Sequence, residues 1–378
     1  MGGSGERRFL IVAGEASGDA HAARLLTALS GLGPCRACGV AGPALLAAGA
    51  GRAVPMEDLA VLGFSGVVAR LPRIWSAYRR LLAEARTFRP HAALLVDSPG
   101  FNFRIGPALR RLGVPIFYYI APQVWAWHPE RAAQMARWVD RLAVIFPFEE
   151  ALFRDAGVQA RFIGHPLLEG LDPEADAAAF RAEIGAAAGA PILGLLPGSR
   201  PQELRAHAPV MAGAARRLRA SRPDLAVVLA LAPGLEREAR RLRSVFDGVR
   251  LVTGRTRAVE AHATCCAVAS GTATLETALF GTPEVIVYRT GWLNYEIARR
   301  VVTLARIGLP NIVAGAEVAP ELLQGDLSVE RLAATLAPWL DDPGARERQC
   351  ELLAAVRARL GGPGAARRAA EWLWEMVA

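Results

Sequence analysis

Residues 9–19 read Phe-Leu-Ile-Val-Ala-Gly-Glu-Ala-Ser-Gly-Asp, an apolar run that ends in a turn of small and acidic residues. Residues 9–13 are long enough for one buried strand, and the Ala- and Leu-rich segment that follows has the pattern of a helix. A strand followed by a helix is part of a βαβ unit, from which parallel sheets are built. Ligands in such sheets bind at the carboxyl ends of the strands, where this turn lies.

The same arrangement recurs along the chain. Further apolar runs that end in polar or small residues lie at 92–96, 115–120, 142–146, 192–196, 226–231, 267–269 and 284–287. Helical patterns separate them, so we predict an α/β fold with two doubly wound, Rossmann-like domains facing each other across a cleft. The predicted joint is residues 164–190, which are rich in Pro, Gly, Ala and acid.

Composition excludes several classes of protein. With 52% hydrophobic and 21% charged residues, the 378-residue chain is neither disordered nor fibrous. All 44 basic side chains are Arg, which excludes a Walker-A, Schiff-base or pyridoxal-phosphate lysine. The net charge of +8 suggests an anionic partner: nucleic acid, an acidic lipid surface or a phosphorylated substrate. No apolar stretch reaches the roughly 18 residues of a membrane span, so a cytoplasmic protein is expected.

Metal-binding patterns are weak. Cys35 and Cys38 form a C-x-x-C, but no second pair or nearby His completes a zinc site. D-x-D is absent, so the usual carboxylate platform for a divalent cation beneath a diphosphate is missing. We predict no metal and no cofactor.

Two turns in the second half suit an anionic ligand. Pro197-Gly198-Ser199-Arg200 follows an apolar run, and its backbone donors, hydroxyl and guanidinium fork suit a diphosphate. Ser270-Gly271-Thr272 repeats this arrangement, and Glu276, one turn into the next helix, could accept both ribose hydroxyls of a nucleotide. A capped loop is the alternative at each turn. Together the two turns favour a nucleotide-sugar site.

The first half offers carboxylates at the ends of apolar runs. Asp97 could act as a general base for an alcohol, or it could cap the next segment. Glu15 and Asp19 are its rivals as the base. The turn that carries them, with Gly14, Ser17 and Gly18, could border an acceptor or be a tight capped turn.

Aromatic residues follow the run at 115–120. Trp125 and Trp127 could line a sugar or lipid pocket or fill the core, and His128 after them is expected to be structural.

Residues 66–90 combine six Arg with an apolar stripe at helical spacing. Such a helix could lie on an anionic bilayer with Leu71, Trp75, Tyr78 and Leu82 facing the lipid. The alternative, an ordinary amphipathic helix with its stripe in the core, is nearly as well supported.

These motifs resemble those of lipid-A-disaccharide synthases, glycosyltransferases of bacterial lipid A assembly. The similar stretches run in family order over about residues 9–325: GEASGD (14–19), MEDLAVLG (56–63), DSPGFN (97–102), QVWAW (123–127), FPFE (146–149), FIGHP (162–166), LPGSR (196–200), ASGTATLE (269–276), Tyr288-Arg289 and LPNIVAG (309–315). LPGSR and SGTATLE also occur in looser form in other enzymes that use UDP-sugars. His128-Pro129 departs from the family, which usually has Arg followed by polar or basic residues there.

The resemblance implies a B-type glycosyltransferase fold whose C-terminal helix returns to the first domain. The domains would be 1–168 with about 355–378, and 169–354. It also implies a metal-independent, inverting enzyme at the cytoplasmic face of the inner membrane. UDP-2,3-diacylglucosamine and 2,3-diacylglucosamine 1-phosphate (lipid X) would give a β-1,6-linked disaccharide 1-phosphate and UDP. Arg289 and Asn311 would join Ser199, Arg200 and the 270–276 turn at the UDP-sugar. Asp97 in the first domain would then lie opposite the leaving UDP.

Other functions remain open. A UDP-N-acetylglucosamine 2-epimerase or another lipid-linked-sugar glycosyltransferase would have the same fold, although an epimerase needs no lipid-binding helix. A nucleic-acid-binding protein would fit the charge, but no basic tail, zinc spacing or RNA-binding aromatic signature supports it, so we expect no nucleic-acid partner. The oligomeric state stays open, a homodimer included.

Overall fold

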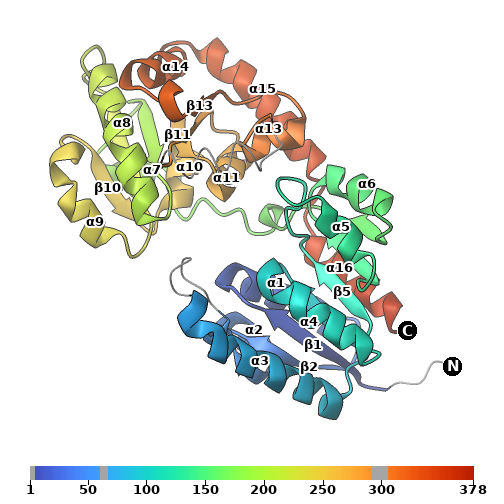
Figure 1. The fold of residues 1–378 in the computed structure, drawn as a ribbon. Helices are drawn as coiled ribbons and strands as arrows, with labels where there is room; N and C mark the ends of the chain where they lie inside the picture. Colours follow the sequence, from blue (N-terminus) through green and yellow to red (C-terminus); the bar gives the residue numbers. More distant parts are fainter. Residues whose placement is uncertain (1–4, 60–66, 292–304) are drawn as a thin grey trace. The chain divides into compact units, whose positions relative to one another are not determined.

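The computed structural model describes residues 5–59, 67–291 and 305–378. The chain divides into two compact units: Met1–Glu169 with Gly361–Ala378, and Gly170–Leu360. Each unit is a parallel sheet with helices on both faces, which confirms the predicted α/β class (Figure 1).

In the described part of the first unit, seven strands form one sheet in the order β3-β2-β1-β4-β5-β6-β7, with every neighbouring pair parallel. The strands are β1 (Arg7–Ala13), β2 (Cys35–Ala41), β3 (Gly51–Pro55), β4 (Ala92–Val96), β5 (Ile116–Tyr119), β6 (Arg141–Val144) and β7 (Ala160–Phe162). Side chains alternate between the two faces: Leu10 and Val12 of β1 lie in one core, Phe9 and Ile11 in the other. Both faces are buried, which explains why the strands are apolar throughout.

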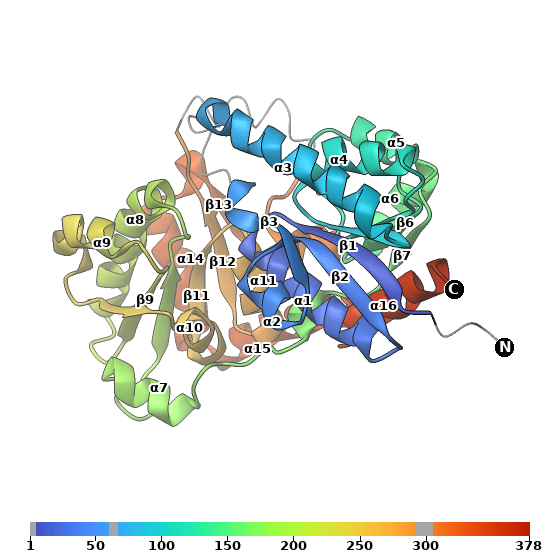
Figure 2. The ribbon, with the colours of Figure 1, turned by 90° about the horizontal axis from the view of Figure 1, so that it is seen from below.

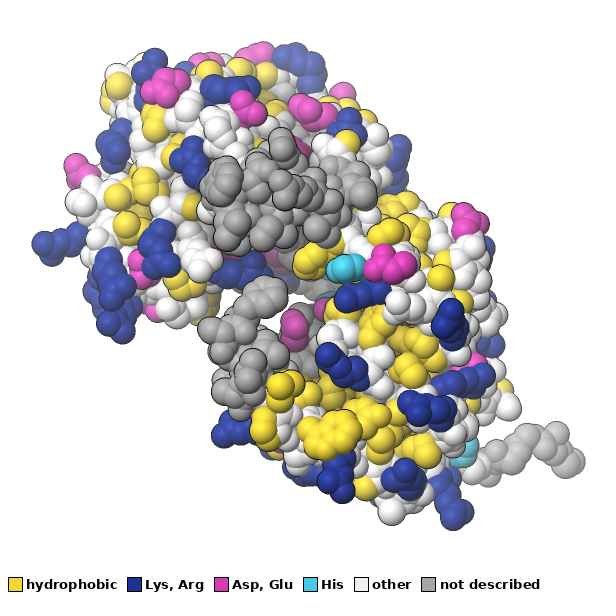
Figure 3. All heavy atoms as spheres, viewed as in Figure 1, with side chains coloured by type: hydrophobic (Ala, Val, Ile, Leu, Met, Phe, Trp, Pro, Cys, Tyr) yellow, Lys and Arg dark blue, Asp and Glu magenta, His cyan; other side chains and the backbone are white. Residues whose placement is uncertain are grey.

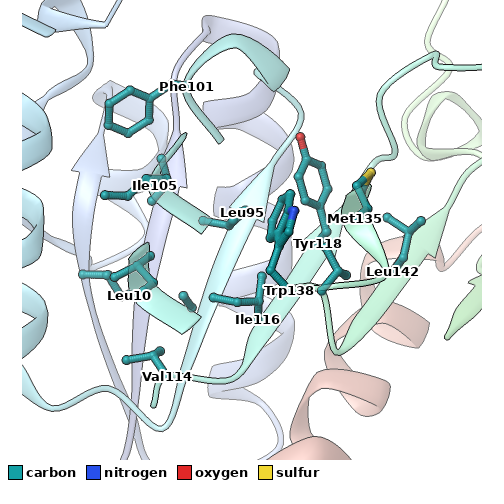
Figure 4. Packing of buried hydrophobic residues seen from close by; sticks show 14 of the residues in the cluster. Leu10, Leu95, Phe101, Ile105, Val114, Ile116, Tyr118, Met135, Trp138 and Leu142 are labelled. Carbon is teal, nitrogen blue, oxygen red and sulfur yellow. The ribbon is translucent and has the colours of Figure 1, made fainter. Parts of the chain in front are cut away.

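Helices from different parts of the chain cover the two faces. One core contains residues of α3 (Val67–Phe88), α4 (Pro99–Arg111), α5 (Glu130–Met135) and α6 (Pro147–Asp155). Figure 4 shows part of this core, where Leu95, Ile116 and Tyr118 of adjacent strands lie beside Trp138. The other core contains residues of α1 (Ala16–Ser30), α2 (Pro43–Ala47) and α16 (Ala365–Met376).

In the described part of the second unit, six strands form a parallel sheet in the order β10-β9-β8-β11-β12-β13. These are β8 (Ile192–Leu196), β9 (Ala226–Leu231), β10 (Arg250–Thr253), β11 (Cys265–Ala269), β12 (Glu284–Tyr288) and β13 (Glu321–Leu323). Helices α8 (Pro201–Arg219), α9 (Glu236–Arg241) and α14 (Val329–Asp341) contribute to the core on one face, and α7 (Ala177–Ile184) and α10 (Thr256–His262) to the other. The unit also contains α11 (Thr272–Phe280), α13 (Leu309–Ala314) and α15 (Pro343–Arg359).

The boundaries differ in detail from those expected. Part of the predicted joint belongs to the second unit, because Phe180 of α7 is fully buried in its core. The C-terminal segment is two helices, since α15 ends at Arg359 and α16 begins at Ala365. Only α16 belongs to the first unit, where it contacts α1 (Figure 2). Arg7 of β1 donates to the Trp374 carbonyl at 2.7 Å, and its guanidinium lies 4.0 Å from the centre of the Trp374 ring.

Candidate active site

The strand order of the first sheet reverses between β1 and β4. β2 and β3 lie on one side of β1, whereas β5, β6 and β7 lie beyond β4. Ala13 pairs with Val96, so the segments after β1 and β4 leave the sheet at the same edge. Such a topological switch point is where doubly wound sheets bind ligands. It brings together the Gly14–Asp19 turn and Asp97, which are far apart in the sequence.

Asp97 and Ser98 have an unusual backbone. Their φ angles are +45° and +41°, a left-handed conformation that costs non-glycine residues about 1–3 kcal/mol each. The Asp97 carbonyl is held by the Tyr118 hydroxyl at 2.5 Å and by the Asn102 amide at 2.7 Å. Strain that the surrounding structure maintains in this way is typical of functional sites. Sequence reasoning did not single out Tyr118 or Asn102, although Asn102 lies within the DSPGFN motif.

The electrostatics of Asp97 suit a general base. Burial raises the pKa of Asp97 to about 6, and the negative charge of Glu15 adds to the shift, while the Ser98 amide opposes it. Glu15 is exposed at the N-terminus of α1, and its side chain does not cap that helix. The buried Ser98 hydroxyl oxygen has no hydrogen-bond partner in the described residues. A carboxylate with a pKa of about 6 can accept a proton from a bound alcohol at neutral pH.

Asp19 has a different role from the one predicted. Its side chain is 2% exposed. Its two carboxylate oxygens accept from the amides of Gly42, Ala44 and Leu45, at 2.8, 2.8 and 3.3 Å. The carboxylate therefore holds the N-terminus of α2, where the helix dipole favours a negative charge. The prediction of Asp19 as an acceptor-pocket residue or rival base is wrong, because its oxygens are buried and occupied.

The small residues of the same turn divide between surface and core. Ser17 is exposed on α1, whereas Gly14 and Gly18 are buried. The two glycines let the turn lie close to β4 and the residues after it: a Cβ on Gly18 would be 3.7 Å from a Val96 methyl, and one on Gly14 would be 2.7 Å from the Ser98 hydroxyl oxygen.

The two tryptophans also differ from each other. Trp125 is 8% exposed, donates to Glu149 at 2.9 Å and packs edge-on against Phe146 and Phe148. It is a core residue, so its prediction as a pocket residue is wrong. Trp127 is 57% exposed and stacks on His128. The buried Glu149 was missed from the sequence.

The strand order of the second sheet reverses between β8 and β11. Leu196 pairs with Val268, so the turns at Pro197–Arg200 and Ser270–Thr272 leave the sheet at neighbouring positions on the same edge. The two turns predicted to bind a nucleotide thus share the switch point of their own unit.

The first of these turns is already capped. Glu203 accepts from the amides of Ser199 and Arg200 at 2.9 and 3.1 Å. Position 198 requires glycine, because its φ is +108° and a Cβ there would clash with the Glu203 carboxylate. The expectation that these two amides meet phosphate is wrong for this arrangement. The Arg200 guanidinium, 77% exposed, lies 3.0 Å from Glu203. A Glu three residues after the N-cap residue of the helix was the sequence signal, because Glu203 at this position reaches back to the backbone amide of Arg200.

The second turn is open. Gly271 and Thr272 are exposed, and in the described residues no side chain caps α11. The Ser270 hydroxyl, by contrast, donates to the Ile307 carbonyl at 3.1 Å. Glu276 lies 3.3 Å from Arg257; burial raises its pKa, and the positive charge of Arg257 opposes that shift. The N-terminus of α11 is thus the anion-suited element of this turn.

The side chains of Arg289 and Asn311 form hydrogen bonds to other residues of their own unit. The Arg289 guanidinium donates to the carbonyls of Gln324 and Leu327. Asn311 is fully buried; its amide nitrogen donates to the Ala319 carbonyl and to Glu321, and its amide oxygen accepts from the amides of residues 318 and 319. The predicted contact of Asn311 with a UDP-sugar is wrong, because its amide is buried and both of its donors and its oxygen are occupied within the unit. The contact predicted for Arg289 stays a prediction.

The apolar stripe predicted on helix α3 lies partly on the surface and partly against the core. Leu71 and Trp75 are 52% and 60% exposed, whereas Tyr78 and Leu82 are half-buried against the core. Tyr78 stacks under Trp75 with ring centres 5.3 Å apart. Figure 3 shows hydrophobic side chains gathered on this unit, with basic side chains around them. Leu71 and Trp75 are thus the exposed members of the stripe, whereas Tyr78 and Leu82 also pack against the core.

No helix in the described ranges is long and apolar enough to cross a membrane. No group of three or more His, Cys, Asp or Glu side chains in the same ranges could hold a metal ion. Residues 60–63 of the MEDLAVLG motif lie outside the described residues.

Solved structures of low identity share this fold. The UDP-N-acetylglucosamine 2-epimerase from Neisseria meningitidis bound to UDP-N-acetylglucosamine superposes with a TM-score of 0.68 at 12% identity, over 97% of this chain and 100% of that chain. CalG4, the calicheamicin glycosyltransferase, superposes with a TM-score of 0.60 at 18% identity, over 98% of both chains. The fold is therefore that of the B-type class, which contains glycosyltransferases and epimerases.

Sequence relatives narrow this class. The family model described as lipid-A-disaccharide synthetase matches residues 9–362. Proteins named lipid-A-disaccharide synthase from Anaeromyxobacter sp. (strain K) and Myxococcus xanthus (strain DK1622) are 47% and 43% identical, over 96% and 98% of this chain and 96% and 97% of theirs. The chain belongs to the lipid-A-disaccharide synthase family, which confirms the resemblance seen in its motifs. It is a hexosyltransferase that acts on lipid A precursors.

Proposed function

We propose that this protein transfers 2,3-diacylglucosamine from UDP to the 6-hydroxyl of 2,3-diacylglucosamine 1-phosphate, forming a β-1,6 disaccharide 1-phosphate and UDP. The observation that carries the proposal is the chemistry at the two switch points. One has a carboxylate of raised pKa. The other has the N-terminus of α11, which no side chain of the described residues caps, and an exposed arginine on the turn after the neighbouring strand.

The donor site would be the edge of the second sheet. The UDP diphosphate would bind at the N-terminus of α11, near Gly271 and Thr272, where amide donors and the helix dipole favour an anion. Arg200 has an exposed guanidinium that can leave its weak surface pair with Glu203 and fork onto phosphate. Glu276 would accept from the ribose hydroxyls; burial raises its pKa, and the neighbouring Arg257 opposes that shift by favouring the ionised form.

The acceptor site would be the edge of the first sheet. Asp97 would remove the proton from the attacking hydroxyl as that oxygen bonds to the anomeric carbon and the bond to UDP breaks. Its pKa of about 6 leaves it ionised at neutral pH yet basic enough to accept a proton. The exposed Ser17 would hold the acceptor through its hydroxyl, and the exposed Glu15 tunes Asp97 by its charge.

Membrane attachment is part of the proposal. Leu71 and Trp75 are exposed on a helix rich in Arg. Exposed apolar side chains flanked by basic ones are typical of a helix that lies on an anionic bilayer. Contact with the anionic cytoplasmic face of the inner membrane would bring the enzyme to its diacylated substrates.

A single assay tests the function. The protein is incubated with both acylated substrates, in excess EDTA, and UDP release and disaccharide are followed. We expect turnover that EDTA does not remove, because Arg200 and the α11 N-terminus would stabilise the leaving group. UDP release with no disaccharide, or an epimer formed from UDP-N-acetylglucosamine alone, would contradict the proposal.

A further inference from the structure

His207 is a fully buried polar residue that the proposed reaction does not use. It lies on α8, in the unit that carries the donor site. Its Nδ1 is 2.8 Å from the Pro197 carbonyl oxygen, and its Nε2 is 2.9 Å from the Arg289 amide nitrogen. Both contacts are to the backbone, and both partners lie at the carboxyl ends of strands.

The partners fix the state of the ring. The Arg289 amide can only donate, so Nε2 must accept and the ring proton must be on Nδ1, which donates to Pro197. The imidazole is therefore neutral. Burial holds the pKa of His207 below its usual value; the Pro197 carbonyl and Glu203 oppose this shift, and the Arg289 charge adds to it.

The two bonds join separate strands. Pro197 follows β8 and Arg289 follows β12, and β11 lies between these strands in the sheet. The imidazole thus spans the edge that carries both nucleotide turns. The chain of contacts continues beyond it, because the Arg289 guanidinium holds the carbonyls of Gln324 and Leu327. His207 and Arg289 together therefore connect the start of the Pro197–Arg200 turn to the segment after β13.

We propose that His207 is a positioning residue for the donor nucleotide. It fixes the Pro197–Arg200 turn relative to the end of β12, the strand on the far side of β11, so that Arg200 and the α11 N-terminus meet one diphosphate. This inference rests on the proposed donor site. It adds a residue that has no contact with substrate and acts through the backbone of the turn.

Two variants test the hydrogen bonds of His207 to Pro197 and Arg289. His207→Leu removes both of them. His207→Asn keeps a donor near the position of Nδ1 but lacks the reach to accept from Arg289. We expect His207→Leu to weaken UDP binding at least tenfold and to raise the KM for the donor, with the acceptor KM unchanged. His207→Asn should lose less UDP affinity than His207→Leu, because it keeps one of the two hydrogen bonds.

A matched control separates positioning from folding. Leu225 is buried at the amino end of β9, away from the edge that carries the turns, so Leu225→Ala removes core contacts of the same unit. It should lower the melting temperature while leaving UDP affinity within twofold of wild type. Calorimetric titration with UDP and thermal melting are measured on all four proteins.

The outcomes distinguish the two proposals. Wild-type protein that binds no UDP refutes the donor site, and this inference with it. If wild type binds and both His207 variants bind equally well, only the positioning role is refuted. An equal loss of affinity in Leu225→Ala also refutes it, since any destabilisation would then suffice. If His207→Leu does not fold, His207→Asn decides alone: an unchanged donor KM refutes the role.

Discussion

Gly14 lies directly against Ser98: a Cβ atom on Gly14 would be 2.7 Å from the Ser98 hydroxyl oxygen. The two residues follow adjacent parallel strands, and Ser98 belongs to the strained pair that presents Asp97. The glycine therefore leaves room for the backbone conformation of the candidate base.

Gly14→Ala should disturb this pair without touching the donor site. A shift of about 1 Å in a catalytic group can cost on the order of 10² in rate, so we expect a loss of at least that order in turnover with unchanged UDP affinity. Gly100→Ala is the matched control, because a Cβ at Gly100 meets nothing within 4 Å. Comparable activity in the two variants would show that close contact with Ser98 is unimportant.

Asp97→Asn should lose about 10²- to 10⁴-fold in turnover, the usual worth of a positioned base, and should bind UDP normally. In wild type, kcat/KM should fall as the pH drops below about 6, because Asp97 then takes up a proton. The raised pKa also means that ionised Asp97 destabilises the folded state above this pH, so Asp97→Asn should not lower the melting temperature at about pH 8. Near-normal turnover here, with collapse in Glu15→Gln, would transfer the role to Glu15.

Arg200→Lys keeps the positive charge but loses the planar fork. We expect at least a tenfold loss in kcat/KM, about 1.4 kcal/mol of transition-state stabilisation. Arg331 is an exposed arginine paired with Asp326, and Arg331→Lys is the control, which should leave kcat/KM unchanged. Full activity in Arg200→Lys would remove Arg200 from the diphosphate site.

Leu71→Ser with Trp75→Ser should reduce binding to anionic vesicles, because both side chains are exposed. The melting temperature should change little. Leu81→Ala on the same helix removes a fully buried side chain and should cost about 2–5 kcal/mol of stability instead. A large drop in melting temperature for the double variant would mean that the whole stripe belongs to the core.

Glu260 and Glu284 are fully buried, and their carboxyl oxygens have no hydrogen-bond partner in the described residues. Burial raises the pKa of Glu260 to about 9, with the charge of Glu276 adding to it; burial and the nearby Glu260 hold the pKa of Glu284 well above its usual value. The folded unit therefore keeps protons that the unfolded chain releases near pH 4.5. Because the unfolded state binds fewer protons, the free energy of unfolding should fall as the pH rises from about 5 to about 9.

Urea unfolding at about pH 5 and about pH 9 measures this slope. Glu260→Gln with Glu284→Gln should flatten it, whereas Glu347→Gln, at an exposed position, should leave it unchanged. An unaltered slope in the double variant would show that these carboxyls do not control the pH dependence.

The order of strands and helices, the polar turns and the position of Asp97 at a strand end were determined by the sequence itself. Period-two and helical patterns are local, so they can be read from neighbouring residues. The family motifs were recognisable for the same reason, since each is a short contiguous stretch.

Only the tertiary structure decided which turns share an edge and which polar groups are already occupied. Strand order brings Gly14 beside Ser98, and long-range contacts bury Asp19 at α2 and Asn311 beside Glu321. In sequence, Asp19 and Asp97 are both carboxylates after apolar runs; in the fold, one is held by three amides and the other is strained, with a pKa near 6. A carboxylate's availability depends on partners tens of residues away, and no local pattern encodes them.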